Sequence, residues 1–214
     1  MILWMVCYTY RFQFILFINY KKLIMKKNFI IFRHEKTDRP EQQTLSEWLK
    51  SGLNEEGSER SLVLADNLKQ YGIELIYSSP RLRAYQTAEL AGFKLGIPVY
   101  TDKRLDEINL GLLGDMTYDE ISRYYPELWA NRYDCASFIH DAAPGGESKY
   151  AVRERIFDFL YSLLRTPEQA VGIASHELNM VYFLTALGYG GDSIDFGRCF
   201  VVEYDYGGEC FRLK

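Results

Sequence analysis

The sequence of 214 residues lacks paired cysteines, excess basic charge, internal repeats and long apolar runs, and these absences narrow its class. Its four cysteines, Cys7, Cys135, Cys199 and Cys210, show no C-x-x-C spacing. They form neither a zinc pattern nor a disulfide framework, so we expect a reducing, cytoplasmic setting. The net charge of −4 argues against nucleic acid as a partner, because a phosphate backbone needs a basic face.

The first 24 residues, 1–24, differ in composition from the rest of the chain. Their most apolar run, residues 12–18, is too short to span a bilayer, and no signal-peptide pattern surrounds it. Met25 is followed by two lysines and then directly by an apolar strand pattern, as a natural start would be. We therefore expect residues 1–24 to be a translated upstream artefact and residues 25–214 to be the folded domain. A peripheral membrane anchor is the alternative, and no membrane is expected as a partner unless this extension is made.

The remainder alternates between strand and helix patterns, and 48% of all residues are apolar, enough for one large core. Strands are expected at 28–32, 73–77 and 170–174, helices at 54–71, 81–95, 149–165 and 178–187, and a terminal hairpin that supplies edge strands at 199–213. Such alternation is typical of βαβ units, so we predict an α/β fold with a mostly parallel sheet.

Two of the apolar strands end at a histidine. The strand before Arg33-His34 stops abruptly there, and the strand before Ser175-His176 repeats the pattern. In open α/β sheets ligands bind at the carboxyl ends of strands. A cation beside an imidazole suits an anionic ligand and a nucleophile, although His34 alone could equally be a loop histidine.

Further candidates follow the next strand and its helix. Ser78-Ser79-Pro80 leads into a helix whose first turn offers backbone N–H groups and the guanidinium of Arg81 or Arg83, which together suit a phosphate. On sequence grounds either arginine could face the site. A proton donor for a leaving oxygen needs a nearby carboxyl group, and Asp106 or Glu107 could supply it.

The aromatic segment 124–141 is irregular, and we interpret it as a lid or a wall of the substrate pocket. Its aromatic residues suggest a partly apolar leaving group. His140, within it, is expected to be a surface histidine rather than a ligand.

Five motifs occur in a fixed order: Arg33-His34, Ser78-Ser79-Pro80 followed by Arg83-Ala84, Leu105-x-Glu107-Ile108, Pro144-Gly145-Gly146-Glu147-Ser148, and Ser175-His176. In this order they resemble the histidine phosphatase superfamily, in the branch similar to cofactor-dependent phosphoglycerate mutase. The resemblance runs from about Met25 to the C-terminus. It implies a three-layer α/β/α sandwich with a mostly parallel central sheet, a phosphohistidine mechanism, no metal and no cofactor.

The resemblance also implies roles for six residues: His34 as nucleophile, Arg33, Arg83 and His176 as the phosphate pocket, Glu107 as proton donor, and Thr37 as a further phosphate contact. We expect a neutral imidazole whose second ring nitrogen is held by a backbone carbonyl. The expected activity is hydrolysis of a small phosphorylated metabolite. The alternatives are a phosphoglycerate-mutase-type phosphotransferase, ranked lower because the stretch 83–105 is short, and an inactive phospholigand-binding module. A homodimer is compatible with the sequence.

Two residues depart from the family pattern, because Glu35 and Glu177 follow the two histidines where glycine is usual. An unpaired carboxylate there would repel phosphate. The two glutamates could turn outward or onto Lys36 and Arg39, reshape the pocket for an unusual substrate, or share acid–base duty with Glu107. They could also mark a protein that has lost turnover.

Overall fold

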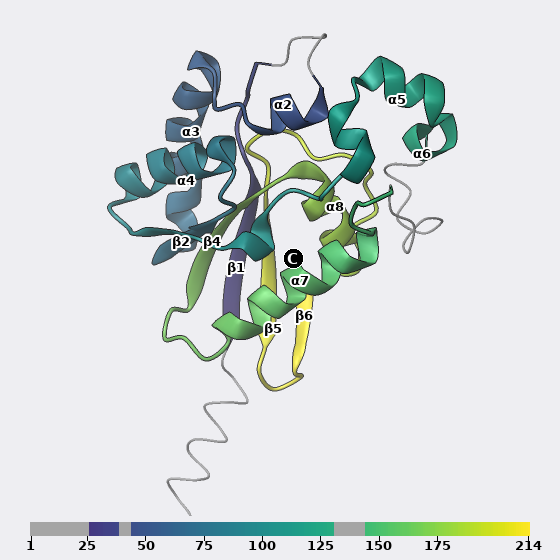
Figure 1. Ribbon diagram of the computed structural model, residues 1–214. Coiled ribbons are helices and arrows are strands. Elements are labelled where there is room, and N and C mark those ends of the chain that lie inside the picture. The colour runs from purple at the N-terminus through teal and green to yellow at the C-terminus, as the bar shows by residue number, and fades with distance from the viewer. Residues whose placement is uncertain (1–25, 39–43, 131–143) are drawn as a thin grey trace, which may run out of the picture.

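The computed structural model describes residues 26–38, 44–130 and 144–214 (Figure 1). The predicted extension 1–24, Arg39 and His140 lie outside these ranges. In the part of the chain that is described, no helix is both long enough and apolar enough to cross a bilayer.

One six-stranded sheet, in the order β3-β2-β4-β1-β5-β6, forms the centre of the fold. Its strands are β1 (Lys26–Arg33), β2 (Leu75–Ser78), β3 (Val99–Thr101), β4 (Ala170–Ser175), β5 (Cys199–Asp205) and β6 (Cys210–Leu213). The first four strands of that order are mutually parallel, whereas β5 and β6 run antiparallel to their neighbours. The prediction of a mostly parallel sheet is confirmed.

The two edges of the sheet differ from expectation. The terminal hairpin forms, with the N–H groups of Gly207 and Gly208 donating to Asp205 Oδ1 in its turn. Only β6 is an edge strand, however, because β5 lies between β1 and β6. The opposite edge is β3, which the sequence analysis missed since three residues are too few to show an alternating pattern.

Helices cover both faces of the sheet and complete a three-layer α/β/α sandwich (Figure 1). The helices are α2 (Leu45–Leu49), α3 (Glu55–Leu68), α4 (Leu82–Leu95), α5 (Tyr118–Tyr124), α6 (Pro126–Ala130), α7 (Lys149–Leu163) and α8 (Glu177–Thr185), with 3-10 turns at Lys69–Tyr71, Lys103–Leu105 and Gly111–Asp115. Helices α3 and α4 lie on one face, and α7 and α8 lie on the other.

The central strand β1 divides the core between these two faces. Phe29 and Ile31 pack in the cluster formed with α7 and α8, while Ile30 and Phe32 pack in the cluster formed with α3 and α4. Side chains alternate along a strand, so a strand that is apolar at every position is buried on both faces. Arg33 is the last residue of β1 and therefore lies at the carboxyl end of this buried strand.

The first turn of helix α3 packs against the loop that follows β1. The side chain of Asn54 caps the helix by accepting from the N–H of Gly57 at 2.8 Å, and its backbone N–H donates to the carbonyl of Lys36. A Cβ atom at position 57 would lie 2.1 Å from that carbonyl oxygen, so only glycine allows this approach. The contact fixes the path of the chain just after His34.

Candidate active site

The register of two parallel strands brings the two histidines together. In the β1–β4 pairing Arg33 lies opposite Ser175, so His34 and His176 leave the sheet at the same level. Their ring centroids are 5.2 Å apart, and the N–H of His34 donates to the carbonyl of Ser175 at 3.0 Å. The expected meeting of two residues that are far apart in the chain is observed.

His34 is held in one tautomer. Its Nδ1 lies 2.8 Å from the carbonyl oxygen of Glu35, and because a carbonyl can only accept, Nδ1 carries the proton. Nε2 then has a free lone pair, and it accepts from Nε of Arg83 at 3.0 Å. Burial, reinforced by the charge of Arg83, holds the pKa of His34 well below 6.5. The imidazole is therefore neutral at neutral pH.

Arg83, rather than Arg81, connects the two histidines. Its side chain is fully buried in the first turn of α4, where Nη1 donates to the carbonyl of Leu49 at 2.9 Å and Nη2 lies 3.2 Å from Nδ1 of His176. Burial lowers the pKa of Arg83 to about 10, so it stays cationic at neutral pH. Of the two arginines that the sequence left open, Arg83 is the one that contacts both histidines.

His176 is oriented by a residue to which the sequence analysis gave no role. Ser79 Oγ lies 2.8 Å from Nε2 of His176, and since Nδ1 accepts from Arg83, the Nε2–H group donates to Ser79. Burial is the main cause of a pKa for His176 well below 6.5. The motif Ser78-Ser79-Pro80 was recognised, but only the strand order shows that β2, next to β4, carries Ser79 to this ring.

Glu107 is the carboxyl group that reaches the site. Its Oε2 lies 3.8 Å from Nη2 of Arg83 and 3.6 Å from Nδ1 of His176. Burial raises the pKa of Glu107 although Arg83 opposes the rise. Asp106 instead accepts from the N–H of Glu107 at 2.8 Å and from Arg81 at 2.5 Å, so it supports Glu107 from outside.

Arg33 ends β1 next to His34, and Thr37 lies three residues beyond His34 in the chain. The guanidinium carbon of Arg33 lies 4.0 Å from the ring centroid of Phe196, and its Nη1 donates to the carbonyl of Ile194. The charge of Arg33 contributes to the lowered pKa of His34, which places it near the imidazole. Thr37 is buried in the loop between His34 and α3.

The two glutamates that replace glycine both bind arginines. Glu177 Oε2 lies 3.1 Å from Nη2 of Arg33, and its Oε1 accepts from the N–H of Ile194 at 3.3 Å. Glu35 is buried and accepts from Nε of Arg60 on α3 at 2.7 Å. Lys36, one partner considered for them, pairs with Glu56 instead. Each carboxylate is therefore neutralised by a guanidinium.

Both glutamates also hold the loop 194–197 in place. Arg60 donates to the carbonyl of Phe196 at 3.3 Å, and Phe196 lies with its ring centroid 5.7 Å from that of His34. Gly197 has φ of +66°, and a Cβ there would lie 1.9 Å from Glu35 Oε1. Sequence patterns gave no signal for this loop, because its contacts join segments that are far apart in the chain.

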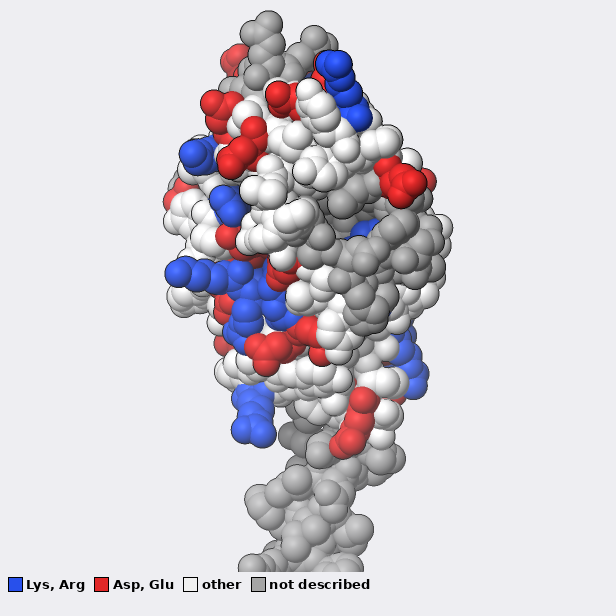
Figure 2. All heavy atoms as spheres, turned by 45° about the vertical axis from the view of Figure 1, so that its right-hand side comes forward, with Lys and Arg blue, Asp and Glu red and all other residues white. Residues whose placement is uncertain are grey.

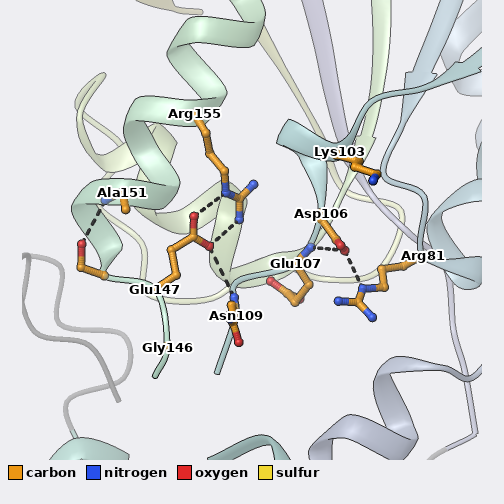
Figure 3. A pocket seen from close by; sticks show the side chains of 10 residues that line it. Arg81, Lys103, Asp106, Glu107, Asn109, Gly146, Glu147, Ala151 and Arg155 are labelled. Carbon is orange, nitrogen blue, oxygen red and sulfur yellow. Dashed lines mark hydrogen bonds and ion pairs between the residues drawn. The ribbon is translucent and has the colours of Figure 1, made fainter. Parts of the chain in front are cut away.

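A cleft of about 970 Å³ opens beside Glu107 (Figure 3). Six of its ten lining residues carry a formal charge: Arg81, Lys103, Asp106, Glu107, Glu147 and Arg155. Figure 3 shows Glu107 between the Arg81–Asp106 pair and the Glu147–Arg155 pair. Residues 131–141 of the predicted lid segment lie outside the part of the chain that the structure describes, so its place beside this cleft stays a prediction.

The surface around the cleft carries charge of both signs. On the face shown in Figure 2, a group of basic side chains lies directly beside acidic ones. Such a surface does not favour a polyanionic partner over a small molecule.

Comparisons with known proteins identify a family model and several relatives that match this chain. The family model described as the histidine phosphatase superfamily (branch 1) matches residues 29–214. Phosphoserine phosphatase 1 of Hydrogenobacter thermophilus is 30% identical over 163 residues, which are 74% of each chain. Phosphoglycerate mutase-like protein 4 of Arabidopsis thaliana is 31% identical over 149 residues, which are 67% of this chain and 59% of that protein.

Solved structures show the same fold. A mycobacterial glucosyl-3-phosphoglycerate phosphatase superposes with a TM-score of 0.74 at 23% identity, over 88% of this chain and 97% of that one. Bacillus stearothermophilus YhfR gives a TM-score of 0.73 at 26% identity, over 87% and 95% of the two chains. The predicted α/β sandwich is thereby confirmed.

Proposed function

Because the chain belongs to the histidine phosphatase superfamily (branch 1), we propose that it hydrolyses phosphomonoesters of small metabolites through a phosphohistidine on Nε2 of His34. The observation that carries this proposal is the pair of hydrogen bonds at His34, from Nδ1 to the carbonyl of Glu35 and from Arg83 to Nε2. They leave a neutral imidazole whose lone pair faces a guanidinium. This arrangement suits a nucleophile with a cation beside it that stabilises the group under attack.

In the first step the lone pair of Nε2 attacks phosphorus and the ester P–O bond breaks. Glu107, whose burial favours the protonated form, gives its proton to the departing oxygen. Positive charge that develops on the imidazole is stabilised by the Glu35 carbonyl at Nδ1. Arg83, Arg33 and His176 hold the oxygens of the transferring group, with Thr37 as a further contact, and no metal takes part.

In the second step water replaces the histidine. The carboxylate of Glu107 takes a proton from the water, the water oxygen attacks phosphorus and the P–N bond breaks. Inorganic phosphate leaves, and His34 returns to its neutral form.

Cys199 and Cys210 are free thiols, which fits the cytoplasm as the setting we propose.

The relatives suggest which substrates to try. Those quoted above are named for phosphoserine and glucosyl-3-phosphoglycerate, which are small phosphorylated metabolites. We propose that the substrate of this chain belongs to the same broad class of phosphomonoesters.

The test is hydrolysis of p-nitrophenyl phosphate by the wild type and by His34→Asn, which keeps a polar side chain but removes the nucleophilic ring nitrogen. We expect turnover in the wild type and a loss of at least about 10³-fold in the variant. Rapid acid-free quenching with labelled substrate should trap label on His34 of the wild type. Glu59→Gln changes an exposed residue of α3 and serves as a control, which should keep the turnover of the wild type.

Three outcomes would contradict the proposal. Full turnover by His34→Asn would remove the nucleophile from its role. No turnover by a folded wild type that still binds phosphate would indicate a binding module. Phosphoryl transfer between phosphoglycerates that requires a bisphosphoglycerate primer would indicate a mutase.

A further inference from the structure

Arg81 stands where the phosphate pocket meets the cleft. It is the N-cap residue of α4, two positions before Arg83, and its side chain is 34% exposed. Its charge lowers the pKa of both Arg83 and His176, so it lies close to the residues expected to hold the phosphoryl group. It also lines the cleft beside Glu107. Arg81 can therefore reach a substrate bound across the two.

The hydrogen-bonding capacity of Arg81 is only partly used. Nε donates to Asp106, whereas Nη1 and Nη2 make no hydrogen bond with any residue that the structure describes. Figure 3 shows this guanidinium beside Asp106 and next to Glu107. Two parallel N–H groups of an arginine form a fork that matches the two oxygens of a carboxylate.

Two other cations line the cleft, and only one of them is held in an ion pair with a described residue. Arg155 is bound by Glu147 at 2.7 and 3.0 Å and donates to the carbonyl of Arg104 at 2.5 Å, which makes it structural. Lys103 is exposed and forms no ion pair within the described ranges. With Arg81 paired to Asp106 and Arg155 to Glu147, Lys103 leaves the cleft with one positive charge in excess while Glu107 is protonated.

The chemistry decides where a leaving group must lie. Its bridging oxygen has to meet Glu107, and Glu107 lines the cleft, so the rest of the leaving group extends into the cleft past Arg81. We propose that Arg81, assisted by Lys103, binds a carboxylate on the leaving group, so that the preferred substrates are phosphomonoesters of small hydroxy acids. This inference rests on the proposed hydrolytic function and adds the substrate class to it.

The test compares substrates that differ only in the carboxylate. One pair is O-phosphoserine and O-phosphoethanolamine, and a second pair is 3-phosphoglycerate and glycerol 3-phosphate. The measured quantity is the ratio of kcat/KM within each pair. A ratio cancels any effect on Glu107 transmitted through Asp106, because such an effect changes both members alike.

We expect the wild type to favour the carboxylate member of each pair by at least about tenfold. Arg81→Gln should bring the ratio close to one, and Arg81→Lys, which keeps the charge without the fork, should give an intermediate value. Lys94→Gln removes a charge from the far end of the same helix, where Lys94 pairs with Asp66, and should leave the ratio unchanged.

Calorimetric binding of the same four compounds to His34→Asn gives a readout that does not need turnover. Equal binding of both members of a pair, or a preference that survives in Arg81→Gln, would overturn the proposal. Either result can occur while p-nitrophenyl phosphate is still hydrolysed through His34. In that case the carboxylate site fails and the proposed function stands.

Discussion

Nε of Arg83 donates a hydrogen bond to Nε2 of His34 over 3.0 Å, which places the guanidinium at the lone pair that attacks phosphorus in the proposed reaction. Two further bonds, to the carbonyl of Leu49 and to His176, fix the plane of the same group. A phosphoryl group that enters between them takes over donors that are already aimed and desolvated. Such donors stabilise a transition state without a further cost of reorganisation.

Replacing Arg83 by lysine should therefore cost activity although the charge is kept. A single ammonium group cannot contact His34, His176 and the Leu49 carbonyl together, and we expect kcat/KM for p-nitrophenyl phosphate to fall by about 10²- to 10³-fold. Arg198→Lys, at an exposed position, is the matched control and should change little. Circular dichroism confirms that the variants are folded. Activity within threefold of the wild type would contradict the role given to the guanidinium.

The raised pKa of Glu107 predicts that the site costs stability at alkaline pH. The folded state binds this proton more tightly than the unfolded state, so the free energy of unfolding falls as the pH rises from 4.5 through the folded pKa. Glu107→Gln removes that loss. We expect its Tm to exceed the wild-type Tm by about 2–4 °C at alkaline pH and to match it in acid, while turnover is lost.

The control for this measurement is Glu154→Gln, because Glu154 is an exposed carboxylate on α7. Its Tm should follow the wild type at every pH. A Glu107→Gln protein that is destabilised equally at all pH values would show that the carboxylate acts as a structural partner of Arg83 instead.

Glu177 should weaken the hold of the site on inorganic phosphate. Its carboxylate lies 3.1 Å from Nη2 of Arg33 and competes with an anion for that guanidinium. Glu177→Gln keeps an oxygen for the N–H of Ile194 but removes the charge, so phosphate should inhibit at about three- to tenfold lower concentration. Asp195→Asn, in the neighbouring exposed loop, removes the same charge as a control. Weaker inhibition in Glu177→Gln would mean that Arg33 depends on the pair for its position.

The contact between Glu35 and Gly197 predicts a coupling between two mutations. Gly197→Ala combines φ of +66° with a Cβ that would lie 1.9 Å from Glu35 Oε1, so it should cost more than the roughly 1 kcal/mol expected for a left-handed alanine alone. Gly72→Ala has φ of +60° with open space around it and measures that smaller cost.

Adding Glu35→Gly should lower the stability cost of Gly197→Ala to that of Gly72→Ala, because the clashing carboxylate is gone. Urea unfolding of the two single variants and the double variant gives the coupling free energy, which we expect to be about 1 kcal/mol or more. Additive effects would show that the two residues do not share this space in solution.

Local sequence signals predicted the parts of the fold that depend on neighbours in the chain. The cap at Asn54 and the capping box between Thr117 and Glu120 are local in this sense, because each joins residues three apart in the chain. The burial of β1 follows from its unbroken apolar run. That run located the carboxyl end of β1, and hence Arg33 and His34, from the sequence.

Contacts between distant segments could not be read in this way. The sequence marked Glu35 and Glu177 as unusual, but their partners Arg60 and Arg33 depend on how α3 and the 194–197 loop pack. The choice between Arg81 and Arg83 likewise depends on the rotation of α4 about its axis. Spacing within one helix leaves that rotation open until the neighbouring strands are placed.

The pairing of Arg33 with Ser175 across β1 and β4 has a consequence for how the protein loses activity. A slip of one residue between these strands would shift one imidazole relative to the other by about 3.3 Å and reverse which side of the sheet each neighbour faces. The spacing of the two rings is thus set by the backbone ladder rather than by a flexible loop. On heating, catalysis should end at the temperature at which the sheet melts, with no partly active species between.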